Sequence, residues 1–283
     1  MEGLNLSKRL LFHALGLMGT RLAPEDRITL LAIVGSMVRQ DLKRQLMDLT
    51  GGIIQGGPFA GCRLLRGTSW SRDGDFVPKV LGCYEAELHN VLTAAASRRY
   101  DTFIDVGCAE GYYATGFSRL SEQTRVLAFD TSPSAQEIAR ASARDNGVAD
   151  RVEVFGALDP EGLASILARS GRTFILSDCE GFERTLLDPS KVPSLSRTDM
   201  LIECHDFIEP GATECLMARF SRTHAVTRID QGARNPHRAE PMWARPELVR
   251  WLMVCESRAV PMHWLHCLSS RGQIEARDGL ETS

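Results

Sequence analysis

The sequence lacks long hydrophobic runs and has no large excess of charge of either sign. Its apolar runs are far shorter than the ~18 to 20 residues that a helix needs to cross a bilayer, so we expect no membrane span. The chain carries 33 Lys and Arg against 36 Asp and Glu, and this balance gives no overall positive field to hold a polyanion. We therefore expect neither a nucleic acid nor a membrane among its partners.

Paired cysteine motifs are also missing. The chain has eight cysteines but no Cys-x-x-Cys pair and no His-x-x-x-His, which argues against a zinc ribbon and against a redox motif. Several cysteines lie within apolar segments, where a free thiol behaves as a small hydrophobic group. We interpret them as reduced core residues of a cytoplasmic protein.

The first part of the chain has a helical pattern. Residues 5–18 and 26–48 carry apolar side chains at helical spacing. Lys8 and Arg9 precede the apolar part of the first segment, as in an export signal, but no clear small-x-small cleavage site follows. We therefore interpret residues 5–18 as an amphipathic helix.

A glycine-rich break, residues 51–58, follows the second helix, and after it we expect a short strand at 62–65. We divide the chain into an N-terminal helical segment, residues 1–75, and a larger domain, residues 76–283. Apolar helices outside a complete core need something to bury against. The first segment is therefore expected to form a lid over substrate or the surface of a homodimer.

Segments of helix and strand character alternate from residue 79 onward. The expected helices are 79–97, 112–120, 135–146, 161–169, 182–187 and 212–220, and the expected strands are 102–106, 125–129, 151–155, 173–176, 200–203, 224–229 and 262–268. Such alternation needs helical crossovers between neighbouring strands. We predict an α/β fold: a doubly wound, Rossmann-like, mostly parallel seven-stranded sheet with an N-terminal helical appendage. The irregular stretch 232–246 is long for a connector and is expected to be a lid or binding element.

The segment 103–113 places a strand end, a glycine turn and a helix start in succession. Gly107 and Gly111 allow a ligand and the backbone to approach closely. Asp130 ends the next strand about twenty residues later, where a carboxylate can accept hydrogen bonds from ribose hydroxyls. Together these features predict a cofactor that contains adenosine.

The charges around the glycine turn favour one adenosine cofactor over another. Asp105 and Glu110 flank the turn and would repel a pyrophosphate, and Ala109 stands where the second glycine of G-x-G-x-x-G belongs. S-adenosylmethionine carries a sulfonium and an ammonium, which nearby carboxylates attract. The sequence therefore favours S-adenosylmethionine over NAD, although an NAD-dependent oxidoreductase with the same fold remains the alternative.

Three motifs carry a resemblance to a known family. Residues 105–111, Asp-Val-Gly-Cys-Ala-Glu-Gly, followed by Asp130, resemble the cofactor motifs of class I S-adenosylmethionine-dependent methyltransferases. Residues 177–183, Ser-Asp-Cys-Glu-Gly-Phe-Glu, are similar to the D-x-E-G-x-E element of the FkbM-type enzymes, and 201–205 to their fifth-strand end. The resemblance spans roughly residues 79–210. It implies a methyltransferase domain that methylates a hydroxyl of a small acceptor, such as a glycan, a polyketide or another secondary metabolite.

The same resemblance implies roles for individual residues. The residues implied to hold the cofactor are Asp105, Gly107, Gly111 and Asp130, with Ala157 along the adenine, Asp178 at the cofactor edge and Tyr84 at the methionine end. A protein that binds S-adenosylmethionine without catalysing transfer is a further alternative.

Polar residues follow the fourth and fifth expected strands, where substrate should lie in such a fold. In one hypothesis His205 is the general base and Asp206 or Glu203 orients it. In another, Asp178 and either Glu203 or Asp206, together with His205, hold a divalent ion such as Mg²⁺, which binds two substrate hydroxyls and acidifies one. The catalytic candidates are thus His205, Asp178 and Asp206. The structural alternative is that Glu180 and Glu183 cap a helix and His205 is a satisfied polar residue.

Overall fold

A computed structural model describes residues 22–64, 75–238, 244–258 and 260–270, together with the isolated positions 13, 16 and 19. The helix expected over residues 5–18 therefore lies almost entirely outside the described residues. Among the described helices, none is long and apolar enough to cross a membrane.

The described residues form a seven-stranded sheet with the order β3-β2-β1-β4-β5-β7-β6. The strands are β1 (Thr102–Val106), β2 (Arg125–Phe129), β3 (Val152–Phe155), β4 (Thr173–Ser177), β5 (Asp199–Glu203), β6 (His224–Asp230) and β7 (His263–Ser269). The first five strands are parallel, and β7 runs antiparallel between β5 and β6. The predicted α/β fold with its mostly parallel sheet is confirmed, and all seven expected strands are present.

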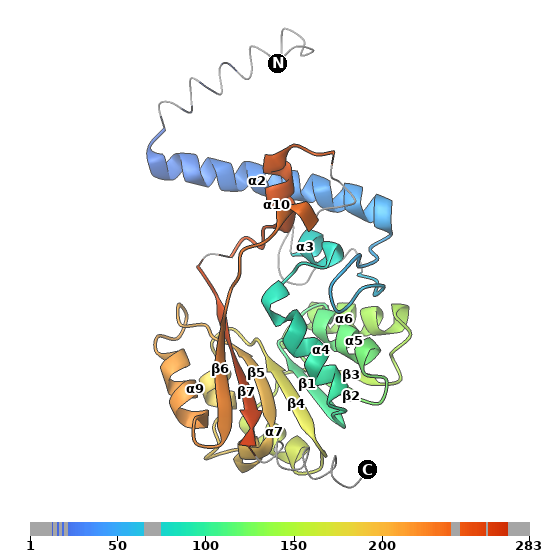
Figure 1. The fold of residues 1–283 in the computed structure, drawn as a ribbon, viewed down its shortest axis with the longest axis vertical. Coiled ribbons are helices and arrows are strands. Elements are labelled where there is room, and N and C mark those ends of the chain that lie inside the picture. Colours follow the sequence, from blue (N-terminus) through green and yellow to red (C-terminus); the bar gives the residue numbers. More distant parts are fainter. Residues whose placement is uncertain are drawn as a thin grey trace.

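Helices cover both faces of this sheet (Figure 1). They are α4 (His89–Ser97), α5 (Tyr112–Leu120), α6 (Pro133–Asp145), α7 (Pro160–Leu167), α8 (Glu183–Leu186) and α9 (Ala212–Phe220), with 3-10 turns η1 (Ala86–Leu88), η2 (Pro193–Arg197) and η3 (Pro236–Arg238). Side chains alternate between faces along each strand. Phe103 packs with residues of α4 to α6, and its neighbour Ile104 packs with residues of α7 to α9. The two faces thus form two separate hydrophobic clusters, and β1, paired with β2 and β4, lies at the centre.

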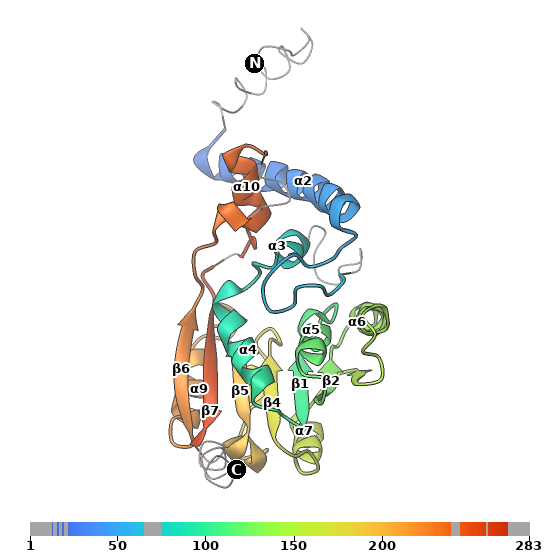
Figure 2. The same cartoon turned by 45° about the vertical axis from the view of Figure 1, so that its right-hand side comes forward.

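Two helices lie beyond the end of the sheet (Figure 2). They are α2 (Pro24–Thr50) and α10 (Glu247–Val254), and the short α3 (Phe76–Leu81) lies between them and the sheet. The C-terminal half of α2 contributes Leu42 and Leu46 to the same hydrophobic cluster as α4 to α6. Phe59, which directly follows the glycine-rich break, packs edge-on against Tyr112 with ring centroids 5.0 Å apart. The second half of the N-terminal segment is therefore built into the core of the α/β fold.

Three sequence expectations need correction. The helix expected over 79–97 is two helices, α3 and α4, because the chain turns at Gly82 and Glu85, which have φ of 71° and 44°. At 62–65 the described residues form only an isolated bridge between Ile53 and Arg63. The helix α10 follows directly on the stretch expected to be irregular, and its pattern was missed in the sequence.

Candidate functional site

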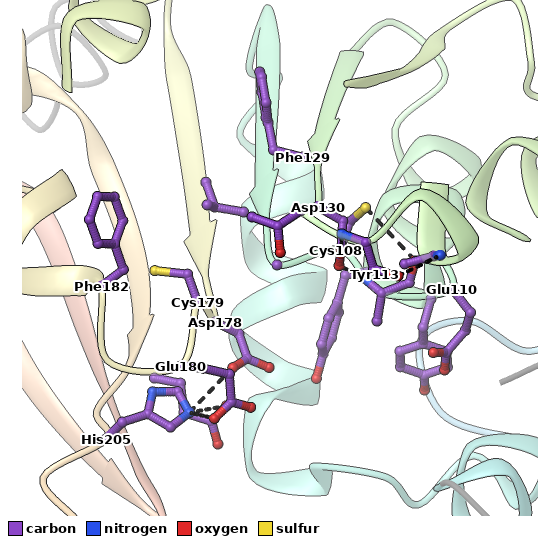
Figure 3. A pocket seen from close by; sticks show the side chains of 18 of the residues that line it. Cys108, Glu110, Tyr113, Phe129, Asp130, Asp178, Cys179, Glu180, Phe182 and His205 are labelled. Atoms are coloured by element: carbon purple, nitrogen blue, oxygen red, sulfur yellow. Dashed lines mark hydrogen bonds and ion pairs between the residues drawn. The ribbon is translucent and has the colours of Figure 1, made fainter. Parts of the chain in front are cut away.

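A pocket of about 950 Å³ opens at the carboxyl ends of the parallel strands (Figure 3). It lies where the strand order reverses between β1 and β4, which is where open α/β sheets bind ligands. Its walls come from residues 106–110, 112, 113, 129–132, 135, 156–159, 178–180, 182, 203, 205, 207, 256–258, 260 and 262, with Asp75, Lys79 and Tyr84. The pocket therefore collects the ends of β1, β2, β3, β4 and β5.

The glycine turn after β1 forms the floor between two strand ends. Gly107 has φ of +83°, and a Cβ built on it would lie 1.6 Å from the carbonyl oxygen of Asp178. Only glycine allows the turn and the segment after β4 to approach this closely. Gly111, with φ of +79°, contacts Ala139 of α6 and does not line the pocket, so its role is the close packing of helices.

Asp130 faces the glycine turn from the end of β2. The amide of Ala109 donates to Oδ2 of Asp130 at 2.9 Å, and the amide of Ser132 donates to Oδ1 at 2.8 Å. These two bonds fix the carboxylate at the pocket wall, and each oxygen keeps a lone pair for a ligand hydroxyl. Ala157, in the segment after β3, lines the same wall. The residues expected to hold a ribose and an adenine are thus brought together.

Asp105 lies behind the glycine turn, inside the sheet. Its side chain is fully buried and does not line the pocket, and neither carboxylate oxygen has a hydrogen-bond partner among the described residues. Burial, with the charge of Asp178 as the next contribution, raises the pKa of Asp105 to about 8. A buried acid in this state would be stabilised as a carboxylate by a cation held nearby.

This pKa predicts a pH-dependent effect of the substitution Asp105→Asn. The folded-state pKa of about 8 is above the ordinary 3.8, so unfolding releases a proton between these values. The stability that Asp105 contributes is complete below pH ~4 and is lost as pH rises through ~8. The asparagine variant should therefore equal the wild type near pH 4 and exceed its free energy of unfolding by about 4 kcal/mol or more near pH 8. Urea unfolding at both pH values measures this, with the exposed Asp150→Asn as control. A stability difference that does not grow with pH would contradict the buried acid.

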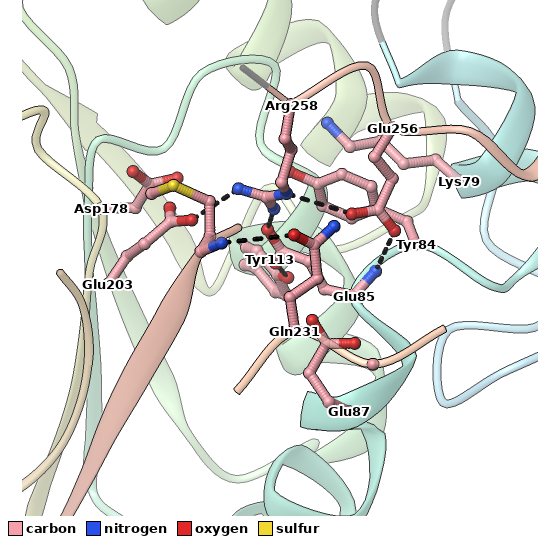
Figure 4. Close-up of polar contacts among 12 residues, drawn as sticks. Lys79, Tyr84, Glu85, Glu87, Tyr113, Asp178, Glu203, Gln231, Glu256 and Arg258 are labelled. Carbon is pink, nitrogen blue, oxygen red and sulfur yellow. Dashed lines mark hydrogen bonds and ion pairs between the residues drawn. The ribbon is translucent and has the colours of Figure 1, made fainter. Parts of the chain in front are cut away.

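The other end of the pocket holds a cluster of buried charges (Figure 4). The guanidinium of Arg258 donates to Glu203 Oε1 at 2.6 Å and to Glu256 Oε2 at 3.1 Å, and it also contacts Glu85. Glu85 accepts a further hydrogen bond from the hydroxyl of Tyr113. Burial raises the pKa of Glu85 to about 7, against the opposing charge of Arg258. Arg258 thus joins three acids from distant segments of the chain.

Lys79 is the second cation of the pocket wall. Its ammonium lies 2.5 Å from Glu110 Oε1 and 4.6 Å from the ring centroid of Tyr84. Burial opposes ionisation of Glu110, but Lys79 holds the pKa of this acid below its ordinary value. Tyr84 was expected in the site from the sequence, whereas Lys79 and Arg258 were missed because neither belongs to a motif.

His205, at the end of β5, lies among four carboxylates. Its Nδ1 is 2.9 Å from Glu183 Oε1, and its Nε2 is 3.4 Å from Asp178 Oδ1, 3.5 Å from Glu180 Oε2 and 3.8 Å from Glu203 Oε2. Burial would lower the pKa of His205, but the hydrogen bond with Glu183 and the surrounding charges raise it above 6.5. The ring is therefore oriented by Glu183, which the sequence had left as a helix-capping candidate.

Asp206 lies outside this group. Its carboxylate accepts hydrogen bonds from the amide and the hydroxyl of Thr213 at the start of α9, the first at 3.1 Å. Asp206 does not line the pocket. Side chains alternate in direction along β5 and its continuation, so His205 and Asp206 diverge. The structure therefore does not bring Asp206 to the ring that it was expected to orient.

Because Asp206 points away from His205, it is also missing from the group of residues that could hold a metal ion. Within the described chain, one atom each of Asp178, Glu203 and His205 lie within 4.8 Å of one another, without Asp206. This set offers a ring nitrogen in place of the oxygens that Mg²⁺ prefers. The carboxylate of Glu203 is already paired with the guanidinium of Arg258. The residues present therefore fit Mg²⁺ poorly.

Most of the charged residues that line the pocket are acidic. Eight lining residues are Asp or Glu, against one Lys and one Arg. Both of these cations are already paired with carboxylates of the site, Lys79 with Glu110 and Arg258 with Glu203. The wall is therefore electronegative and suits a cationic ligand better than an anionic one.

No family model and no curated protein matches the chain. Among solved structures, the O-methyltransferase from Bacillus cereus in complex with SAH is similar over 63% of this chain and 79% of its own, with 16% identity and a TM-score of 0.43. The O-methyltransferase TomG from Streptomyces achromogenes, involved in tomaymycin synthesis and solved with SAM, covers 63% of this chain and 78% of its own, with 13% identity and a TM-score of 0.43. Precorrin-6y C5,15-methyltransferase from Geobacter metallireducens is similar over 64% of this chain and 89% of its own, with 16% identity and a TM-score of 0.40. Similarity at this level carries no functional argument, so the function has to follow from the site.

Proposed function

We propose that this protein is an S-adenosylmethionine-dependent methyltransferase, of the FkbM type that its motifs resemble, acting on a hydroxyl of a small molecule. The observation that carries the proposal is the pairing of Asp130 with the glycine turn in a pocket whose wall is predominantly acidic. A turn of this kind suits adenosine, and the excess of carboxylates suits the sulfonium and the ammonium of this cofactor.

The residues of the wall divide into three parts in this proposal. Asp130 would hold the ribose hydroxyls and Ala157 would lie along the adenine. Tyr84 and Asp178 would favour the cationic methionine end, and so would Asp105, which a cation held nearby would ionise. The cofactor, when bound, supplies an activated methyl group on sulfur. The chain's own residues then have to position the acceptor and manage its proton.

His205 is the group best placed to receive the acceptor's proton. It lines the pocket, and Glu183 fixes its Nδ1, so Nε2 is the nitrogen that faces the carboxylates of the site. Because the pKa of His205 is raised above 6.5, the neutral ring, which alone can act as a base, becomes available at a higher pH than in an ordinary histidine. We therefore assign His205 as general base, Glu183 as its positioning residue and Asp178 as a second polar contact.

The side chains at the mouth of the pocket indicate whether the acceptor is apolar or polar. Phe182, Phe207 and Val260 line it with 41%, 53% and 38% of their surfaces exposed. Apolar side chains left in water at a pocket mouth favour a ligand with an apolar body. Among the acceptor classes implied by the resemblance, a polyketide or another largely apolar metabolite fits this mouth better than a glycan.

Calorimetric titration tests the proposal against the NAD alternative. We expect heat of binding with S-adenosylmethionine and with S-adenosylhomocysteine, and none with NAD. The variant Asp130→Ala should weaken both interactions by about tenfold or more, since it removes the partner of the ribose hydroxyls. Binding of NAD alone would refute the proposal. Tight S-adenosylmethionine binding without methyl transfer to any of a broad panel of hydroxylated acceptors would favour a non-catalytic binding protein.

A further inference from the structure

One corner of the pocket is formed by Lys79 of α3, Tyr84 just after α3, and Tyr112 at the start of α5. The three residues are 8%, 9% and 5% exposed. The two aromatic rings meet edge-on with their centroids 5.6 Å apart. The ammonium of Lys79 lies 4.6 Å from the ring centroid of Tyr84 (Figure 4) and 5.3 Å from that of Tyr112. We call these three side chains the lysine corner.

The lysine corner has hydrogen-bond donors that the protein does not use. An ammonium carries three N–H donors, and Glu110 Oε1 accepts one of them at 2.5 Å. Neither the rest of this ammonium nor the hydroxyls of Tyr84 and Tyr112 have a hydrogen-bond partner among the described residues. Buried polar groups of these kinds usually have a partner, because an unpaired one costs free energy. Two N–H and two O–H donors therefore remain for a ligand of the pocket.

The other cation of the wall, Arg258, has no comparable donors to spare. It donates to Glu203 at 2.6 Å and to Glu256 at 3.1 Å, and it also contacts Glu85. Three carboxylates thus surround its guanidinium, whereas within the described chain the ammonium of Lys79 has one carboxylate at hydrogen-bond distance. An anionic group that enters this acidic pocket therefore finds the unused donors of a cation at Lys79.

We propose that the lysine corner binds the α-carboxylate of S-adenosylmethionine, an inference that rests on the proposed function. This cofactor carries one carboxylate on an otherwise cationic molecule. Hydrogen bonds from an ammonium to a carboxylate are charge-assisted and roughly twice as strong as neutral ones. The hydroxyls of Tyr84 and Tyr112 add two neutral donors. The corner thus distinguishes the intact cofactor from an analogue that lacks the carboxylate.

The position of the corner fits this assignment. Ala109 and Glu110 are neighbours in the glycine turn: the amide of Ala109 donates to Asp130, which we assign to the ribose, and Glu110 contacts Lys79. Consecutive Cα atoms are only about 3.8 Å apart, so one cofactor molecule can reach both places. Asp75 and Glu110 also line the pocket, and their carboxylates suit the ammonium that the cofactor carries on the same carbon as its carboxylate.

Calorimetric titration with S-adenosylmethionine and with its decarboxylated form tests the subsite. The two compounds share the adenosine, the sulfonium and the ammonium, and they differ only in the carboxylate. We expect the wild type to bind S-adenosylmethionine about 10- to 100-fold more tightly. The excess of acids in the wall would by itself favour the decarboxylated compound, which carries one more net positive charge. The carboxylate contact and the overall charge of the pocket therefore predict opposite signs.

Three variants locate the source of this preference. Lys79→Met removes the ammonium and should abolish the preference for S-adenosylmethionine. Tyr112→Phe removes one hydroxyl, leaves the contact between Lys79 and Glu110 in place, and should reduce the affinity ratio about threefold to tenfold. Lys43→Met is the matched control and should keep the wild-type ratio. The ammonium of Lys43 lies 5.1 Å from the ring centroid of Phe76 in α3, but Lys43 does not line the pocket.

Lys79→Met leaves the carboxylate of Glu110 buried without its partner, which destabilises the fold. Lys79→Met combined with Glu110→Gln removes both charges and should lose the preference in the same way, and circular dichroism checks that it is folded. Equal or tighter binding of the decarboxylated compound to the wild type would overturn the carboxylate subsite but not the proposed function. So would an equal loss of preference in Lys79→Met and Lys43→Met. Failure to bind either S-adenosylmethionine or S-adenosylhomocysteine would overturn the proposed function as well.

Discussion

Replacing Gly107 by alanine is expected to weaken the binding of S-adenosylmethionine strongly and to destabilise the fold. The new Cβ would lie 1.6 Å from the carbonyl oxygen of Asp178, so the glycine turn and the segment after β4 would have to separate. Backbone atoms in the middle of a packed sheet cannot move apart cheaply. We expect a loss of about 3 kcal/mol or more in the free energy of unfolding and at least about a hundredfold weaker binding of S-adenosylmethionine.

Gly147 provides the matched control for this substitution. It has φ of +69°, as left-handed as Gly107, but no atom lies within 4 Å of a Cβ built on it. The alanine variant at 147 therefore carries the backbone strain alone, about 1 kcal/mol, and should bind cofactor normally. Urea unfolding and calorimetric titration of both variants separate strain from collision. Equal losses at the two positions would contradict the close approach of Gly107 and Asp178.

Replacing His205 by alanine is expected to lower kcat by about 10²- to 10⁴-fold, the usual contribution of a general base. The affinity for S-adenosylmethionine should stay within about threefold, because the residues assigned to the adenosine lie at the ends of β1, β2 and β3. Single-turnover kinetics with a labelled methyl donor measure the first quantity and calorimetry the second. An unchanged kcat would remove His205 from the chemistry.

The pH profile identifies the role of Glu183 in the same step. In the wild type kcat should rise with pH as His205 loses its proton, and the midpoint of this rise should lie above 6.5, because the hydrogen bond with Glu183 and the carboxylates raise the pKa of His205. Glu183→Gln removes the nearest of these charges and keeps the size of the side chain, so the limb should move to lower pH. A role that is merely structural would lower kcat without moving the limb.

The sequence predicted the elements of the fold where short-range patterns decide them. Most of the strands are short apolar runs, and the helices between them repeat their apolar residues at helical spacing. The helix expected over 79–97 was wrong because periodicity does not register a turn of a few residues. At Gly82 the conformation is imposed by distant backbone, since a Cβ there would lie 2.1 Å from the carbonyl oxygen of Gly56.

The half of the candidate site that we assign to the cofactor was predictable for a similar reason. Gly107 and Asp130 belong to strand ends, and the parallel order of β1 and β2 alone brings such ends together. The catalytic half was predictable only in part. That His205 would face the pocket followed from its place after β5, but whether Glu203, Asp206 or Glu183 would orient it depended on how the segment after β4 turns back.

The sequence by itself thus determined the alternation of strands and helices, the glycine turn and the acid that faces it. These features depend on residues within a few positions of one another, or on a strand order that the crossover rule restricts. Only the tertiary structure decided that Arg258 lies between Glu85 and Glu203, and that Glu183 contacts His205 in place of Asp206. Such pairings join residues far apart in the chain. The sequence fixes which of these residues can carry a charge. The packing of the fold decides which buried acid lies close enough to each of them to form a pair.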